Sequence, residues 1–123
     1  MNKYDPIKTE AKWRKVWQDT DLYKTPSEPK DKLYNLVMFP YPSGNLHIGH
    51  WYAMAPSDVN ARFKRMQGYN VLHPMGFDSF GLPAENAAIK RGINPAVWTN
   101  NNIQESKNSL NLAGIMYDWS TEL

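Results

Sequence analysis

The spacing of apolar and polar residues along the first third of the chain predicts one helix followed by one strand. Asp5-Pro6 has the form of a helix N-cap followed by proline at the first helical position, and apolar residues share one face until about Gln18. A polar, proline-marked stretch at 25–31 indicates a linker. Residues 33–39 are then mostly apolar over a length that suits a buried strand, which the prolines at 40–44 end.

The rest of the chain continues this alternation. A helical pattern runs from about His47 to Gln67, and Gly68 follows it as a C-terminal cap. Pro56 lies inside this pattern, where the loss of one helical hydrogen bond and a clash with a carbonyl predict a kink or a break. The remaining expected elements are a short strand at 69–73, a loop at 74–82, a helix at 83–92 and a last helix at 95–113.

This order of elements predicts the fold class. A strand, a helix and a second strand within about 40 residues imply parallel pairing with a right-handed connection. Two strands do not complete a doubly wound sheet, which normally has five or six. We therefore expect an α/β chain that holds the first part of a Rossmann-like, parallel-sheet nucleotide-binding domain, with 1–32 as an amino-terminal helix and linker and 33–123 as an incomplete domain.

Composition narrows the setting without indicating a chemistry. The 123 residues suffice for one domain, and the 14 basic and 12 acidic side chains give a formal charge of +2. The chain has no cysteine, which excludes disulfides and zinc–thiolate sites and fits a reducing compartment. No stretch suits a membrane span and the start has no apolar h-region, so we expect a cytoplasmic protein without a membrane partner. We interpret the basic run Arg62, Lys64 and Arg65 as a solvated helix face.

The chemistry is concentrated in His47-Ile48-Gly49-His50, which stands where a strand has ended, a loop has turned and a helix begins. Helix starts attract phosphates through free backbone N–H groups and the helix dipole. His47 and His50, at i and i+3, share one face and can stabilise charge on a departing pyrophosphate, while Gly49 lets a flat ring approach the backbone. A His-x-x-His metal pair and two incidental histidines are the alternatives; no third ligand has suitable spacing, so we predict no protein-bound metal.

A second candidate block follows the second predicted strand. Asp78 lies beyond the carboxyl end of that strand, where ligands of open α/β sheets bind, and its carboxylate could pair with an α-ammonium group. The alternative is an aspartate that caps a loop, and from the residues alone that reading is favoured. We interpret His73 as structural, and Glu85 as a carboxylate that suits the first turn of its helix.

His-Ile-Gly-His after a strand resembles the HIGH signature of class I aminoacyl-tRNA synthetases. Cytidylyltransferases and pantetheine-phosphate adenylyltransferase have similar turns, but the flanks are similar to the leucyl enzymes. Three blocks carry this resemblance: MFPYPSGNL at 38–46, GFDSFGLPAENAAI at 76–89 and YDWS at 117–120. Isoleucyl and valyl enzymes typically place histidine after the aspartate, where this chain has Ser79. Glu10, Trp13 and Trp17 match the leading helix of the family.

The resemblance implies activation of leucine by ATP to leucyl-adenylate and its transfer to tRNA(Leu), with magnesium brought by the ATP. It implies that ATP is bound by Pro42, Gly44, His47, Gly49 and His50, and leucine by Met38, Phe39, Tyr41 and Asp78, with His47 and His50 as the catalytic residues. From the residues alone, Met38, Phe39 and Tyr41 could equally be ordinary strand core.

The second family signature, Lys-Met-Ser-Lys-Ser, is not in this sequence. We therefore expect residues 33–123 to be the first half of a catalytic domain, with the remaining part of a synthetase as a possible partner. The alternatives are a catalytically silent fragment or split-enzyme subunit that needs a partner chain, and a small nucleotidyltransferase.

Overall fold

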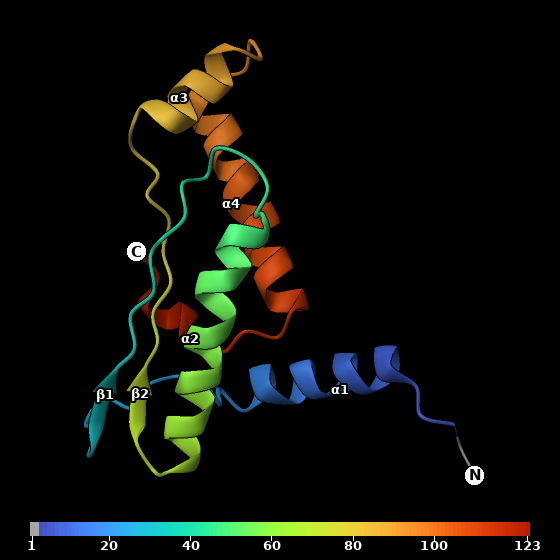
Figure 1. Ribbon diagram of the computed structural model, residues 1–123, viewed down its shortest axis with the longest axis vertical. Helices are drawn as coiled ribbons and strands as arrows, with labels where there is room; N and C mark the ends of the chain where they lie inside the picture. Colours follow the sequence, from blue (N-terminus) through green and yellow to red (C-terminus); the bar gives the residue numbers. More distant parts are fainter. Residues whose placement is uncertain (1–2) are drawn as a thin grey trace.

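A computed structural model of the chain describes residues 3–123 (Figure 1). Helices and strands alternate in the predicted order, and a single turn of 3₁₀ helix lies near the carboxyl end. The elements are α1 (Pro6–Asp19), β1 (Lys32–Tyr34), α2 (Ile48–Met66), β2 (Asn70–Leu72), α3 (Leu82–Ile89), α4 (Pro95–Leu112) and η1 (Trp119–Thr121).

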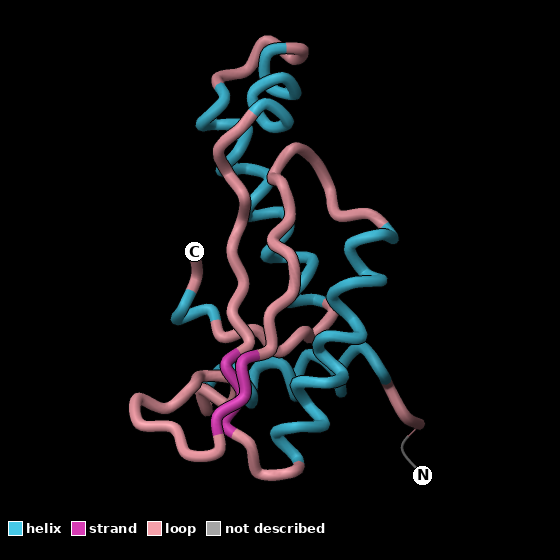
Figure 2. The backbone as a smooth tube through the Cα atoms, turned by 60° about the vertical axis from the view of Figure 1, so that its left-hand side comes forward, coloured by secondary structure: helices cyan, strands magenta, loops and turns pink. Residues whose placement is uncertain are grey.

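The two strands form a parallel pair, as the strand–helix–strand order predicts. Leu33 lies opposite Val71 in the register, and the amide of Asn35 donates to the carbonyl of Leu72 at 2.9 Å as the pairing ends. Beyond this point the segments that follow β1 and β2 continue side by side as extended loops (Figure 2). The strands are three residues each, so the predicted strands at 33–39 and 69–73 are too long.

The segment after β2 has a second backbone neighbour, on the side away from β1. The carbonyl of His73 accepts from the amide of Asp118 at 2.8 Å, and the carbonyl of Met75 accepts from the amide of Leu123 at 3.3 Å. Pro74 between them has no N–H to donate. His73, Met75 and Phe77 therefore bond to the segment 118–123, while Leu72 and Asp78 bond to β1 and its extension.

Helix α2 runs unbroken through Pro56, so of the predicted kink or break the break is wrong, and the kink stays a prediction. A proline inside a helix leaves the carbonyl four residues earlier without its donor, here that of Tyr52. The side chains of Pro56 and Tyr52 are both exposed, so water can satisfy that carbonyl. The predicted cap of α1 is confirmed, because the Asp5 carboxylate accepts from the amide of Lys8 at 3.2 Å.

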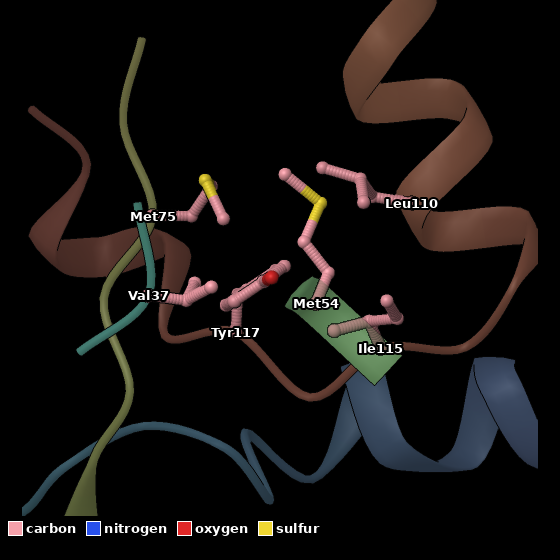
Figure 3. Close-up of a cluster of buried hydrophobic side chains, with 6 residues drawn as sticks. All are labelled: Val37, Met54, Met75, Leu110, Ile115 and Tyr117. Carbon is pink, nitrogen blue, oxygen red and sulfur yellow. The ribbon is translucent and has the colours of Figure 1, made fainter. Parts of the chain in front are cut away.

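The core lies between α2, α4 and the extensions of the two strands (Figure 3). Met54 projects from α2 toward Leu110 of α4, and side chains of the strand extensions and of the carboxyl-terminal segment complete the cluster. Phe39, Leu46 and Trp51 pack against it. The cluster consists of Val37, Met54, Met75, Leu110, Ile115 and Tyr117. The core therefore supports both the loop before α2 and its first turns.

The basic run on α2 is not a solvated face. The guanidinium of Arg62 donates to the Asp58 carboxylate at 2.7 Å and to the carbonyl of Gly114, and Arg65 donates to the carbonyl of Val71 at 3.0 Å. Asp58 is buried and also accepts from the amide of Met116 at 2.8 Å. The two arginines thus attach α2 to β2 and to the segment after α4, which corrects our interpretation from the sequence.

In Figure 1, helix α1 extends sideways from the lower half of α2. Its Arg14 donates to the carbonyl of Leu112 at 3.1 Å, and its Trp17 ring lies 5.5 Å from the Arg62 guanidinium. The division of the chain at residue 32 stays a prediction. Within residues 3–123, no helix is long and apolar enough to cross a membrane.

Candidate functional site

His47 and His50 are bound to the backbone at the start of α2. His47 is the N-cap of the helix, and its Nδ1 accepts from the amide of Gly49 at 3.0 Å. His50, at the third helical position, accepts from the amide of His47 through its own Nδ1, also at 3.0 Å. The two rings face each other with centroids 4.0 Å apart. The predicted pair is therefore close together and held by a reciprocal cap.

Gly49 is required by this cap. A Cβ atom at position 49 would lie 2.9 Å from Cε1 and 3.0 Å from Nδ1 of the His47 ring. Contacts this short are avoided by real side chains, so a larger residue would displace the ring. The flat ring that approaches Gly49 in the structure is thus the imidazole of His47. Gly44, in contrast, has open space where its side chain would be.

Burial lowers the pKa of His50 below its ordinary value of 6.5, and the nearby positive charge of His47 lowers it further. His47 is more exposed than His50. The pair can therefore offer imidazole N–H donors at the helix start, which is the positive end of the α2 dipole. That combination suits an anionic group such as a phosphate.

The second part of the candidate site lies where the two strand extensions run side by side. The amide of Asp78 donates to the carbonyl of Pro40 at 3.1 Å. The segments that follow β1 and β2 are thereby joined beyond the carboxyl ends of the two strands. The Asp78 side chain is exposed. A carboxylate in this position is free to take an ammonium group.

The residues predicted to line an aliphatic pocket divide into two kinds. Phe39 packs against the core cluster, so it fits the alternative interpretation as part of the core. Met38 and Tyr41 are 61% and 52% exposed, and the reading as strand core does not fit them. Pro42 is fully buried in the loop before α2. Its contact with ATP stays a prediction.

His73 is enclosed in the protein and lies outside this site. Its Nδ1 lies 3.2 Å from the carbonyl of Met116, and its Nε2 lies 3.1 Å from the hydroxyl of Ser57. Its ring centroid lies 4.5 Å from that of Tyr117, with the two ring planes tilted by 49°. Burial lowers its pKa to about 4. The contacts agree with the structural role inferred from the sequence.

Two features of the site were missed from the sequence. The reciprocal cap has a local signal, since an acceptor at the N-cap and another three residues later form a capping box, here built from imidazoles. The bond between Asp78 and Pro40 has no such signal. Within residues 3–123, no three His, Asp or Glu side chains gather in a group that could hold a metal ion.

Comparison with known proteins gives a consistent picture. A family model described as tRNA synthetases class I (M) matches residues 36–122. The chain is 57% identical over 121 residues to the leucine–tRNA ligase of Rubrobacter xylanophilus and 56% identical over 124 residues to that of Thermosipho melanesiensis. These matches cover 98% and 100% of the chain but only 15% of either relative.

Two of the solved structures that resemble the chain are synthetase complexes. One is the ternary complex of Agrobacterium radiobacter K84 LeuRS with tRNA and LeuAMS, with a TM-score of 0.93, 47% identity, and coverage of 98% of this chain and 16% of that one. The other is Mycobacterium tuberculosis methionyl-tRNA synthetase with methionyl-adenylate, with a TM-score of 0.71, 29% identity, and coverage of 73% and 18%.

Proposed function

The chain belongs to the class I tRNA synthetase family, and from this membership we propose that it forms one half of a site that activates leucine with ATP. The observation that carries the proposal is the capped pair His47 and His50 at the start of α2, next to two strand extensions that end in exposed polar groups. The names of the similar leucine–tRNA ligases support leucine as the amino acid.

In the proposed reaction the carboxylate of leucine attacks the α-phosphorus of ATP. The bond to the bridging oxygen breaks, and leucyl-adenylate and pyrophosphate result. No side chain is needed as a nucleophile, so the protein contributes position and charge stabilisation. His47 and His50 would donate to phosphate oxygens, and the backbone around Pro42, Gly44 and Gly49 would lie against the nucleotide. Magnesium would arrive with the triphosphate, and no metal ligand is assigned to this chain.

Leucine would be held from the side of the strand extensions. The Asp78 carboxylate would bind the α-ammonium group, and Met38, Phe39 and Tyr41 would contact the aliphatic side chain. The exposure of Met38 and Tyr41 supports this, because such side chains normally gain from cover. Transfer of leucine to tRNA(Leu), and cytoplasmic localisation, belong to the same proposal.

The chain spans about 15% of the length of the curated relatives it matches, and this observation favours a second candidate. In that reading, the chain binds no substrate productively by itself and completes a site only together with further synthetase segments. The two candidates assign the same roles to the same residues. They differ only in whether this chain activates leucine without further synthetase segments.

Leucine-dependent exchange of labelled pyrophosphate into ATP tests both candidates. We would measure the chain alone and a chimera in which it replaces the matching segment of the Rubrobacter xylanophilus enzyme. Exchange by the chimera with leucine, and none with methionine, is expected. Exchange by the chain alone would reject the silent reading. A chimera that folds and binds tRNA but exchanges nothing, while the parent enzyme is active, would reject the proposal.

A further inference from the structure

The two hydrogen bonds at the start of α2 determine where the imidazole protons lie. A backbone N–H can only donate, so the ring nitrogen that it contacts must be an acceptor without a proton. The amide of Gly49 contacts Nδ1 of His47, and the amide of His47 contacts Nδ1 of His50, each at 3.0 Å. In a neutral imidazole the single proton must then be on Nε2 of both rings.

The third histidine is held in the opposite way. Nδ1 of His73 lies 3.2 Å from the carbonyl of Met116, which can only accept, so this nitrogen carries the proton. Its Nε2 then accepts from the Ser57 hydroxyl at 3.1 Å. The chain therefore contains an internal reference for each of the two neutral forms of histidine.

We propose that the reciprocal cap of α2 locks His47 and His50 as neutral Nε2–H tautomers, so that the pair acts as two uncharged donors and His47, besides donating, positions His50. The functional part of this inference rests on the proposed leucine activation; the assignment of the protons does not. An imidazolium has no free lone pair, so protonation of either ring removes one of the two caps.

The surroundings favour the neutral pair. The loop 40–46 and the first ten residues of α2 contain no acid or base other than the two histidines and the phenols of Tyr41 and Tyr52. No carboxylate is therefore supplied by these elements to stabilise an imidazolium. Burial lowers the pKa of His50, and the closeness of the His47 ring, at a centroid separation of 4.0 Å, lowers it further. Two protonated rings at this distance would repel each other.

The assignment has a consequence for substrate binding. A pair of imidazolium ions would bind phosphate more tightly as the pH falls through the ordinary histidine range. Neutral donors held by the backbone would do the reverse, because proton uptake disrupts the cap that aims them. Gly49 contributes to the lock, since a side chain there would displace the His47 ring from its acceptor position.

The test is the nitrogen-15 NMR spectrum of the histidine rings in the whole chain, without substrate. At about pH 8, above the ordinary histidine pKa, we expect protonated Nε2 and bare Nδ1 in His47 and His50, and the opposite in His73. Protonated Nδ1 in His47 or His50, or the averaged pattern of a free imidazole, would overturn the proposal. Because no substrate is present, this result is independent of whether the chain exchanges pyrophosphate.

A pair of variants tests the positioning role. Asparagine is a favoured N-cap and alanine is not, so His47→Asn should preserve the Nε2–H form of His50 and His47→Ala should shift it toward the averaged pattern. Identical His50 spectra in the two variants would show that His47 does not position His50. If either variant fails to fold, the spectrum of the unaltered chain still decides the assignment.

Discussion

The backbone amide of Asp78 donates a hydrogen bond to the carbonyl oxygen of Pro40 across 3.1 Å, so two segments 38 residues apart are joined just beyond the paired strands. The bond uses only backbone atoms. Substitution of the Asp78 side chain therefore leaves the junction in place, and the carboxylate can be tested without loss of the local fold.

Replacement of Asp78 by alanine is predicted to weaken leucine, isoleucine and valine by similar factors, because the carboxylate would contact the ammonium group that all three share. A hydrogen bond to a charged group contributes about 1.5–3 kcal/mol, which corresponds to about 10–150-fold in affinity. ATP affinity should change little. Amino-acid-dependent exchange by the chimera would measure this, with Glu85→Gln as an exposed carboxylate control. An effect on one amino acid alone would place Asp78 near the side-chain end of the pocket.

The His50→Ala variant is predicted to exchange pyrophosphate about 10²–10³-fold more slowly, the loss typical of one donor to a developing charge. The cap from His47 to Gly49 remains in this variant, so the helix should persist. Exchange kinetics and circular dichroism would be compared with those of the unaltered sequence. Equal rates together with matching spectra would remove His50 from the catalytic residues.

The stability of the chain is predicted to fall between about pH 6.5 and pH 4 because of His73. Burial lowers the pKa of this histidine from 6.5 to about 4, so the unfolded chain takes up the proton first. The contribution is fully present above pH 6.5, and about 3 kcal/mol of it is lost by pH 4. Burial alone would raise the pKa of Asp118, but the hydrogen bonds that its carboxylate accepts from Ser120 and Thr25 lower it. Protonation of Asp118 therefore removes further stability at still lower pH.

Urea unfolding at several pH values would measure the effect of His73. The His50→Ala variant is the control, because it removes the other histidine whose pKa is lowered and keeps His73. The same fall in stability is expected in that variant. A free energy of unfolding that stays constant over this range would show that His73 becomes protonated in the folded state without cost.

Exposed apolar side chains on α2 are predicted to make the chain bind a hydrophobic dye and self-associate. They form one stripe along the helix and are between 53% and 86% exposed; its members are Ile48, Tyr52, Val59, Phe63 and Met66. Patches of this kind normally mark an interaction surface or an aggregation hazard. The outer edge of β1 is also unpaired in the described sheet, which adds to the tendency.

A double variant with lysine at Val59 and Phe63 should reduce both dye binding and light scattering. Ile89→Lys on α3 is the matched control, since Ile89 is also 68% exposed but lies away from the stripe. A monodisperse monomer with a sharp thermal transition and no dye binding would contradict the prediction, and with it the expectation that these residues form an incomplete fold.

The local parts of the fold could be predicted from the sequence, and the non-local parts could not. Asp5 and His47 cap their helices within three residues, so pattern and spacing suffice. The backbone bonds of residues 73–77 to the segment 118–123 join parts of the chain more than forty residues apart. The function of Arg62 likewise depends on Gly114, more than fifty residues away.

The same distinction applies to the candidate site. The histidine pair belongs to one turn of helix, and its spacing alone indicated that the rings would meet. Asp78 and Pro40 meet because the two strands are parallel and in a particular register, which the sequence does not specify residue by residue. Phe39 and Met38 alternate along one extension, and only the packed core decides which of them is covered.

Because helix α2 is unbroken, the chain should tolerate an inserted residue less well inside α2 than in the linker. Its 19 residues form a rod about 28 Å long, and its contacts through Met54, Asp58 and Arg65 lie on one stripe. One residue inserted after Met54 would turn the remainder of the rod by about 100° and take Asp58 and Arg65 away from their partners. One residue inserted between Ser27 and Glu28, which are both exposed, would only lengthen a surface loop. Protease resistance of the two insertion variants would show this difference, and equal resistance would mean that α2 adjusts its winding to preserve its attachments.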